Sequence, residues 1–235
     1  MPMRVDILTL FPDVFEPVLG ESITGRARDA GLIDWFITDI RRFAGNKHNK
    51  VDDRPFGGGP GMVMMCKPLW DCVQDVESQD DREPTRILLT PQGEPLTQPL
   101  VEELAGHERL LLIAGHYEGI DQRVIDRLEP REVSVGDYVL SGGEIPSLLL
   151  VDAVTRLLPG ALGHGDSASQ DSFSARDEDG RQLLDCPHYT RPREWEGETV
   201  PDVLVSGDHE KVSRWRLERM KELTRARRPD LLANE

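Results

Sequence analysis

Three glycine-bearing loops are the strongest candidates for chemistry in this chain. They span Thr90–Gly93, Gly115–Asp121 and Ser134–Glu144, and each is entered from a short apolar run. Open α/β sheets bind ligands outside the carboxyl ends of their strands, so loops in this position are expected to meet and form one pocket. The second loop contains His116, the one histidine of the six that we rank above core filler or a surface residue.

Other motifs argue against several kinds of site. The segment Gly57–Gly61 could cradle a phosphate, but it lacks the Gly-Lys-Ser/Thr ending of a P-loop, and no GxGxxG opens a helix. Ser141 lacks the GxSxG turn that presents a hydrolytic nucleophile. The three cysteines, Cys66, Cys72 and Cys186, show no CxxC spacing. Neither zinc nor a disulfide framework is therefore predicted, and a reducing cytosol is the expected compartment.

Two charged residues in the second half of the chain have ordinary structural explanations. Asp171 lies in a polar segment that could fold over a pocket, but an aspartate before Ser-Phe-Ser is also typical of a helix N-cap. Arg156 would by default pair with a surface acid or with Asp152, one helical turn earlier. Residue chemistry alone selects neither as catalytic.

The elements that must position these residues follow from the apolar patterns. We expect strands over Arg4–Leu10, Leu32–Ile40, Arg86–Thr90, Leu110–Ala114 and Val133–Leu140, and helices over Val14–Ala30, Pro68–Val76, Leu96–Ala105 and Ile145–Leu158. Strands that are continuously apolar and alternate with helices indicate a parallel α/β sheet covered on both faces. After Pro159–Gly160 the composition becomes polar and acidic, as in a linker.

The overall charge argues against a polyanionic partner, although the basic residues are concentrated locally. The 235 residues include 28 Lys and Arg against 43 Asp and Glu, a formal net charge of −15. Between Lys211 and Arg228, however, eight basic residues stand against two acids, a local balance of +6. A helix capped by Asp208 should carry this stretch, and a solvated helix face is its ordinary interpretation.

Composition and hydropathy favour a soluble globular chain. Hydrophobic residues make up 38% of the sequence and the mean hydropathy is −0.44. No apolar run approaches the roughly 18 residues of a membrane helix, and the N-terminus does not read as a signal peptide. We therefore expect no membrane partner.

Four longer strings, taken together, resemble one family. The strings Val51–Met62, Gly115–Asp121, Gly136–Glu144 and Leu184–Pro192 are similar, in this order, to motifs of the bacterial tRNA (guanine-N1)-methyltransferases, the TrmD family of the SPOUT superfamily. The resemblance covers essentially the whole chain.

The resemblance implies a more specific architecture than the apolar patterns do. It implies an α/β fold of the SPOUT type, whose parallel sheet carries a C-terminal trefoil knot, followed by a small, mainly helical C-terminal domain. The implied domains are a knotted cofactor-binding domain at 1–160, a flexible interdomain linker at 161–183 and a helical tRNA-binding domain at 184–235. An obligate homodimer is also implied, with tRNA bound across both subunits and each site completed by the partner's C-terminal domain. DNA is not an expected partner.

The resemblance further implies methyl transfer from S-adenosylmethionine to N1 of guanosine 37 of tRNA, next to the anticodon. Asp171 matches the family's general base, Arg156 an arginine that stabilises negative charge on O6, and Glu118 a contact to the target guanine. Arg214 and Arg219 would lie on the surface that binds the anticodon stem. Magnesium dependence is implied as well, but no carboxylate cluster indicates a metal site. Cofactor contacts are implied for Leu89, Pro91, Gly115, Tyr117, Val135, Gly136, Asp137, Tyr138, Val139, Leu140, Gly142 and Gly143.

Two alternatives and two departures accompany this interpretation. A catalytically silent RNA-binding module with the same fold is disfavoured by the retained Asp171, Arg156 and Glu118. A nucleotide-binding enzyme that holds phosphates in its glycine loops is disfavoured by the missing P-loop ending. His116 stands where the family commonly has arginine, and the insertion Ala175–Gln182 lengthens the linker.

Overall fold

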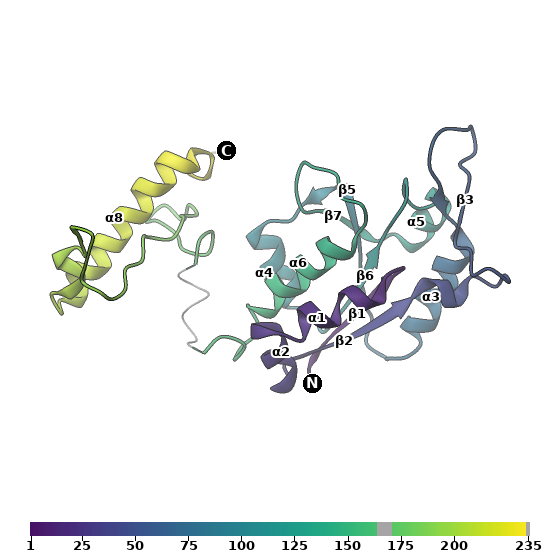
Figure 1. Ribbon diagram of the computed structural model, residues 1–235, viewed down its shortest axis with the longest axis horizontal. Helices are drawn as coiled ribbons and strands as arrows, with labels where there is room; N and C mark the ends of the chain where they lie inside the picture. The colour runs from purple at the N-terminus through teal and green to yellow at the C-terminus, as the bar shows by residue number, and fades with distance from the viewer. Residues whose placement is uncertain (164–170, 234–235) are drawn as a thin grey trace. The chain divides into compact units, whose positions relative to one another are not determined.

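The structure is a computed structural model that describes residues 1–163 and 171–233 (Figure 1). The chain divides into two compact units, Met1–Gly163 and His164–Glu235, and each is described by itself. The linker expected at 161–183 lies partly outside the described residues.

A five-stranded parallel sheet forms the centre of the first unit, in the order β2-β1-β6-β5-β7. Its strands are β1 (Met3–Thr9), β2 (Ile33–Asp39), β5 (Thr85–Pro95), β6 (Arg109–Ala114) and β7 (Arg131–Ser134). Both β1 and β6 are buried along their whole length. After Arg109 the β6 sequence is continuously apolar, as expected of an inner strand of a covered parallel sheet, whereas β1 also buries Arg4, Asp6 and Thr9. The parallel sheet expected from the sequence is confirmed.

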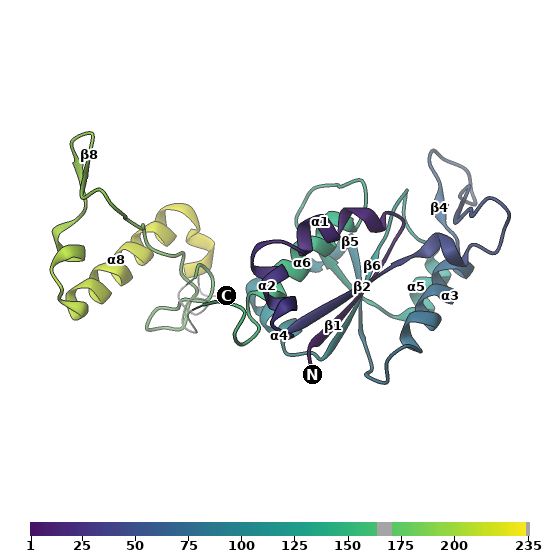
Figure 2. The ribbon, with the colours of Figure 1, turned by 60° about the horizontal axis from the view of Figure 1, so that its bottom comes forward.

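Helices cover both faces of this sheet (Figure 2). One core cluster packs one face of the sheet against α1 (Glu16–Leu19), α2 (Ser22–Asp29), α4 (Gln98–Ala105) and α6 (Glu144–Thr155). The other packs the opposite face against the 3₁₀ helix η2 (Ile40–Phe43), α3 (Cys66–Glu77) and α5 (Gln122–Leu128). A two-stranded ribbon of β3 (Asp52–Asp53) and β4 (Val63–Met64) flanks the glycine-rich segment.

The single helix expected over Val14–Ala30 is wrong. The chain instead forms the 3₁₀ helix η1 (Pro12–Val14), then α1 and α2, with a break at Gly20 and Glu21. A Cβ atom on Gly25 would lie 2.1 Å from the carbonyl oxygen of Gly20, so the end of α1 packs directly on α2. Glu21 is extended and Ser22 has a left-handed φ of +53°, so the two segments cannot form one straight helix, although α2 does end in front of Gly31, as expected.

The strands expected over Arg86–Thr90 and Val133–Leu140 also have different bounds in the structure. Leu89 and Glu94 of β5 both pair with Val133, so Thr90–Gly93 is an outward bulge within one strand and not a turn after it. The strand expected over Val133–Leu140 ends at Ser134, and the remaining residues form a loop. The apolar side chains of this loop do not pack as strand residues would; Val139 is 86% exposed.

The second unit is built around one long helix, α8 (His209–Arg227). Within 171–233 the other elements are the hairpin strands β8 (Glu194–Trp195) and β9 (Glu198–Thr199) and the 3₁₀ helices η3 (Asp202–Val205) and η4 (Pro229–Leu232). Asp208 caps α8 by accepting the Lys211 N–H at 3.1 Å, as expected from the sequence. A small core of Leu183, Cys186 and Met220 holds the preceding chain against the helix. Within the described ranges no helix combines the length and apolarity needed to cross a membrane.

Candidate functional site

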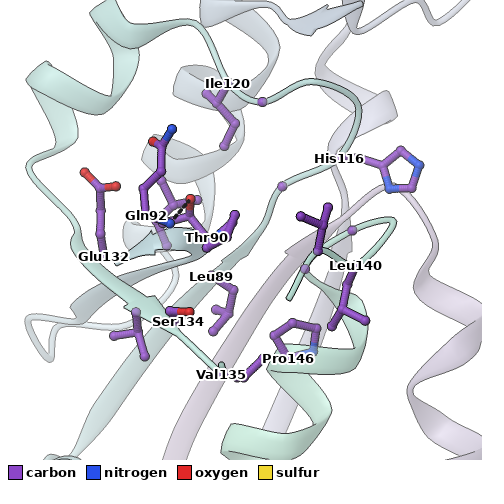
Figure 3. Close-up of a pocket in the computed structure, with 18 of the residues that line it drawn as sticks. Leu89, Thr90, Gln92, His116, Ile120, Glu132, Ser134, Val135, Leu140 and Pro146 are labelled. Carbon is purple, nitrogen blue, oxygen red and sulfur yellow. Dashed lines mark hydrogen bonds between the residues drawn. The ribbon is translucent and has the colours of Figure 1, made fainter. Parts of the chain in front are cut away.

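The three glycine-bearing loops meet at the carboxyl edge of the sheet and line a cavity of about 400 Å³ (Figure 3). The bulge of β5, the loop after β6 and the loop after β7 form most of its wall. The convergence expected from the strand ends is therefore confirmed. A cavity of this size is sufficient for a small-molecule ligand.

Most of the residues implied as cofactor contacts line this cavity. Those that do are Leu89, Pro91, Gly115, Tyr117, Val135, Gly136, Tyr138, Val139, Leu140, Gly142 and Gly143, together with Glu118. Asp137 is not among the lining residues, although it lies in the same loop as its lining neighbours Gly136 and Tyr138. The wall also contains residues that were not expected individually as contacts, among them Gln92, Ile120 and Pro146. Gln92 and Ile120 lie inside two of the three loops and Pro146 follows the third, so their position in the chain was the available signal.

Two of the loops pack against each other through their backbones. The amide of Gly143 donates to the carbonyl of Gly115 at 2.8 Å, and His116 and Gly142 form an isolated antiparallel bridge. A Cβ atom on Gly143 would lie 2.6 Å from the Cα of Ala114, which leaves no room for any side chain. The glycines therefore allow the loop after β7 to cross directly over the end of β6.

The glycine-rich segment also reaches this site, which the sequence did not show. The amide of Glu118 donates to the carbonyl of Met62 at 3.0 Å, and Met64 pairs with Ile120. A Cβ atom on Gly61, at φ +78°, would lie 2.2 Å from Oε1 of Glu118. The backbone of the segment thus supports the Glu118 side chain at the edge of the cavity.

A buried polar cluster supports the cavity from the β1 side. Glu144, in the first turn of α6, is 8% exposed and accepts a hydrogen bond from Oγ1 of Thr9 at 2.8 Å. Its other carboxylate oxygen lies 3.9 Å from Nδ1 of His116, a buried atom without a hydrogen-bond partner among the described residues. The His116 ring packs between Phe11 and Tyr117, with ring centroids 5.0 and 5.2 Å away. Glu144 is well placed because an anion is stabilised at a helix N-terminus.

The two remaining catalytic candidates lie outside the cavity wall. Arg156 is the C-cap of α6, twelve residues beyond Glu144. At a rise of about 1.5 Å per residue, that end of the helix is about 18 Å from the cavity end. Asp171 belongs to the second unit, where its carbonyl accepts the amides of Ser174 and Ala175 in a tight turn.

Acids compensate much of the basic stretch on α8. Among the described residues, five of its eight cations form ion pairs: Lys211 with Asp208, Arg214 with Glu210, Arg219 with Glu222, Lys221 with Glu178, and Arg228 with Asp230. Both arginines predicted to bind RNA are in this paired set. The local balance of +6 therefore overstates the charge that this helix presents.

One cluster in the second unit has the residue types of a metal site. Single ligand atoms of Asp185, Cys186 and His188 lie within 4.8 Å of one another. The Asp185 carboxylate and Nε2 of His188 are already hydrogen-bonded at 2.8 Å, and burial raises the pKa of the Cys186 thiol above its ordinary value. Since metals bind the thiolate and magnesium prefers oxygen ligands, this cluster does not correspond to the implied magnesium requirement.

Comparison with known proteins gives one consistent family. The family profile described as "tRNA (Guanine-1)-methyltransferase TrmD" matches residues 3–234. A protein of Moorella thermoacetica named tRNA (guanine-N(1)-)-methyltransferase is 52% identical over 232 residues, covering 98% of this chain and 90% of that protein.

Two further proteins with the same name show similar coverage. The Rhodopirellula baltica protein is 50% identical over 231 residues, covering 98% of this chain and 94% of its own length. The Stutzerimonas stutzeri protein is 52% identical over 230 residues, covering 98% and 90%. The family profile and the three relatives all match over nearly the full length of the chain. The chain therefore belongs to the tRNA (guanine-1)-methyltransferase family TrmD.

Proposed function

We propose that the protein transfers a methyl group from S-adenosylmethionine to N1 of guanosine 37 of tRNA. The observation that carries this proposal is the single cavity at the carboxyl edge of the sheet, lined by eleven of the twelve implied cofactor residues. The named relatives act on tRNA guanine at N1, which supports the substrate class.

The cavity has the character that a nucleoside-containing methyl donor requires. Apolar side chains such as Leu89 and Leu140 offer contacts for an adenine ring, and the glycine-bearing loops expose backbone amides and carbonyls for its polar edge (Figure 3). When bound, S-adenosylmethionine supplies an already activated methyl group. The protein is left with alignment, base binding and removal of one proton.

Three side chains are proposed to perform these tasks. Glu118, at the edge of the cavity, binds the guanine and orients N1. Asp171 accepts the N1 proton as the N1–methyl bond forms, and Arg156 stabilises the negative charge that shifts to O6. Each of these interactions strengthens toward the transition state, as catalysis requires.

The position of Arg156 supports a site shared between two copies of the chain. Its helix end lies about 18 Å from the cavity of its own unit, so a second copy would bring an equivalent arginine to that cavity. Exposed apolar side chains on η1, α1, α6 and the cavity rim fit this arrangement; they are Val14, Val18, Ile145, Leu149 and Leu140. We infer a homodimer that buries these side chains.

A trefoil knot in the first unit is part of the same proposal. Family membership supports it, and so does the crossing of the Gly142–Gly143 segment directly over the end of β6. The glycines at that crossing are what a chain needs where one segment passes tightly against another.

The decisive experiment measures methyl incorporation from labelled S-adenosylmethionine into tRNA transcripts with guanine or adenine at position 37. We expect incorporation with guanine alone, and mapping should place the methyl group on N1. No incorporation with guanine by the folded protein would overturn the proposal. A silent RNA-binding module would bind both transcripts and methylate neither.

A further inference from the structure

The motif Leu184–Pro192 has no part in the proposed reaction, yet it forms one wall of a groove in the second unit. The groove has a volume of about 360 Å³. Its other walls are the segment 200–205 and the first turns of α8. A hollow of this size accommodates one small-molecule-sized group and not a nucleic-acid duplex.

The floor of the groove is apolar. Val200, Leu204 and Val212 line it and are only partly exposed. Tyr189 lies beside them with half of its surface exposed, and its ring lies 6.3 Å from that of Trp215 at an angle of 59°. An aromatic ring that is held on one side and open on the other is a surface on which a planar group can stack.

The rim of the groove is cationic. Arg191, Arg193 and Arg216 line it, and Arg193 pairs with Asp202 at 2.8 Å. Within residues 1–163 and 171–233, Arg191 and Arg216 form no ion pair. They therefore differ from Arg214 and Arg219, whose charges are already compensated on the same helix. Uncompensated cations above an apolar floor favour a ligand that has a planar apolar group at one end and an anionic group at the other.

We propose that this groove binds one unstacked nucleotide of the substrate tRNA, with the base stacked on Tyr189 and phosphates near Arg191 and Arg216. Proteins recognise single-stranded RNA by stacking splayed bases on aromatic rings and arginine planes. This proposal rests on the proposed function in one respect, which is that the bound RNA is the substrate tRNA. It adds a site that reads a base, where the basic helix alone would offer only phosphate contacts.

A double-mutant cycle between protein and RNA tests this site. Full-length wild type and Tyr189→Leu are titrated with anticodon stem-loop RNAs that carry a single abasic nucleotide at successive loop positions. Tyr189→Leu should weaken binding of the intact RNA about tenfold, since stacking of one base typically contributes that much. At one loop position the abasic RNA should bind both proteins equally, because base and ring are lost together. Arg216→Gln should lower the slope of log affinity against log salt by about one.

Trp195→Leu is the matched control, because Trp195 is an exposed aromatic residue of the same unit outside the groove wall. It should show no coupling to any abasic position, and thermal melting should show that all three variants fold. The proposal is overturned if, at every loop position, the fold-loss of RNA affinity in the combined experiment equals the product of the fold-losses from Tyr189→Leu alone and from the abasic nucleotide alone. That result would mean that the ring contacts none of the bases. If the wild type binds RNA but does not methylate guanosine 37, the proposed reaction is wrong, and the double-mutant cycle still tests nucleotide binding in the groove. If the wild type binds no RNA, both proposals are wrong.

Discussion

At the scale of single residues, the cavity depends on side chains that are supported from a distance. Glu144 is fixed by Thr9, 135 residues earlier, and Glu118 by the backbone around Gly61. Preorganisation of this kind lets a site align reacting groups without ordering them during each turnover.

Replacing Asp171 with alanine should reduce methyl transfer by about 10²- to 10⁴-fold, the usual contribution of a general base. Asp171 lies in the second unit, whereas the lining residues of the cavity belong to the first, so affinity for S-adenosylmethionine should stay close to that of the wild type. Single-turnover rates and calorimetric binding separate the two effects. Asp179→Ala, an exposed aspartate in the same unit, is the control; a fully active Asp171→Ala enzyme would remove Asp171 as the base.

A buried charge pair in the first unit, Arg109 with Asp6, predicts a large stability effect. Arg109 is fully buried; its Nε donates to Asp6 at 2.8 Å, and its terminal nitrogens donate to the carbonyls of Val76, Asp80 and Arg82. Arg109→Met leaves the buried Asp6 carboxylate with Arg4 as its remaining partner. Loss of one partner of a buried pair typically lowers the free energy of unfolding by about 3–5 kcal/mol.

Urea unfolding followed by circular dichroism measures this loss. Lys67→Met serves as the control, because Lys67 makes an exposed pair with Asp71 on α3 and its removal should hardly move the midpoint. An Arg109→Met midpoint equal to that of the wild type would show that the buried network does not stabilise the fold.

At the scale of elements, the inserted segment and α8 form one structure. Residues 176–182 fold into a hairpin in which Arg181 pairs with Asp177, and Glu178 reaches Lys221 of α8 at 2.8 Å. Lys221 in turn lowers the pKa of the Glu178 carboxyl below its ordinary value. The insertion thus neutralises one cation of the helix that is proposed to meet RNA.

Glu178→Gln should therefore tighten tRNA binding about twofold, because Lys221 becomes available to a phosphate. The slope of log affinity against log salt should become steeper by about one. Filter binding over a series of salt concentrations gives both values. Asp179→Asn changes the charge equally but acts on a residue that pairs with Arg181 inside the hairpin. Equal effects of the two variants would attribute the change to net charge and not to Lys221.

At the scale of the whole molecule, the exposed apolar surface on α6 calls for a covering partner. Ile145 is 58% exposed and Leu149 is 45% exposed, and they lie one helical turn apart. Apolar side chains gathered in this way on a monomer are characteristic of an interface. The proposed homodimer would place this surface, and with it the cavity rim, between two copies of the chain.

The double variant Ile145→Asp with Leu149→Asp should sediment as a monomer at concentrations where the wild type is a dimer. Two charges on each side of a two-fold interface face one another and must also lose their hydration, both of which oppose association. Methyl transfer should fall in parallel if the site is shared. Trp195→Asp places a charge on an exposed apolar residue of the other unit and should leave the dimer intact. A dimeric double variant would place the interface elsewhere.

Local patterns determined much of this protein in advance. The apolar runs and the glycines that follow them predicted the parallel sheet, its two covered faces and the meeting of three loops, because side-chain periodicity and glycine freedom act over a few residues. The same patterns failed where distant contacts decide. Pairing with Val133, about 40 residues later in the chain, turned an expected loop into a bulge of β5.

The site divides in the same way. Sequence motifs located the three loops that line the cavity, Glu118 among their residues, since each loop is a short continuous segment of the chain. Only the tertiary structure brought Thr9 to Glu144, Gly61 to Glu118 and Glu178 to Lys221. Only it showed which arginines of α8 form ion pairs with other described residues. Contacts between residues far apart in sequence depend on how the elements pack. That packing is determined by the whole chain, whereas periodicity can be recognised within a short segment.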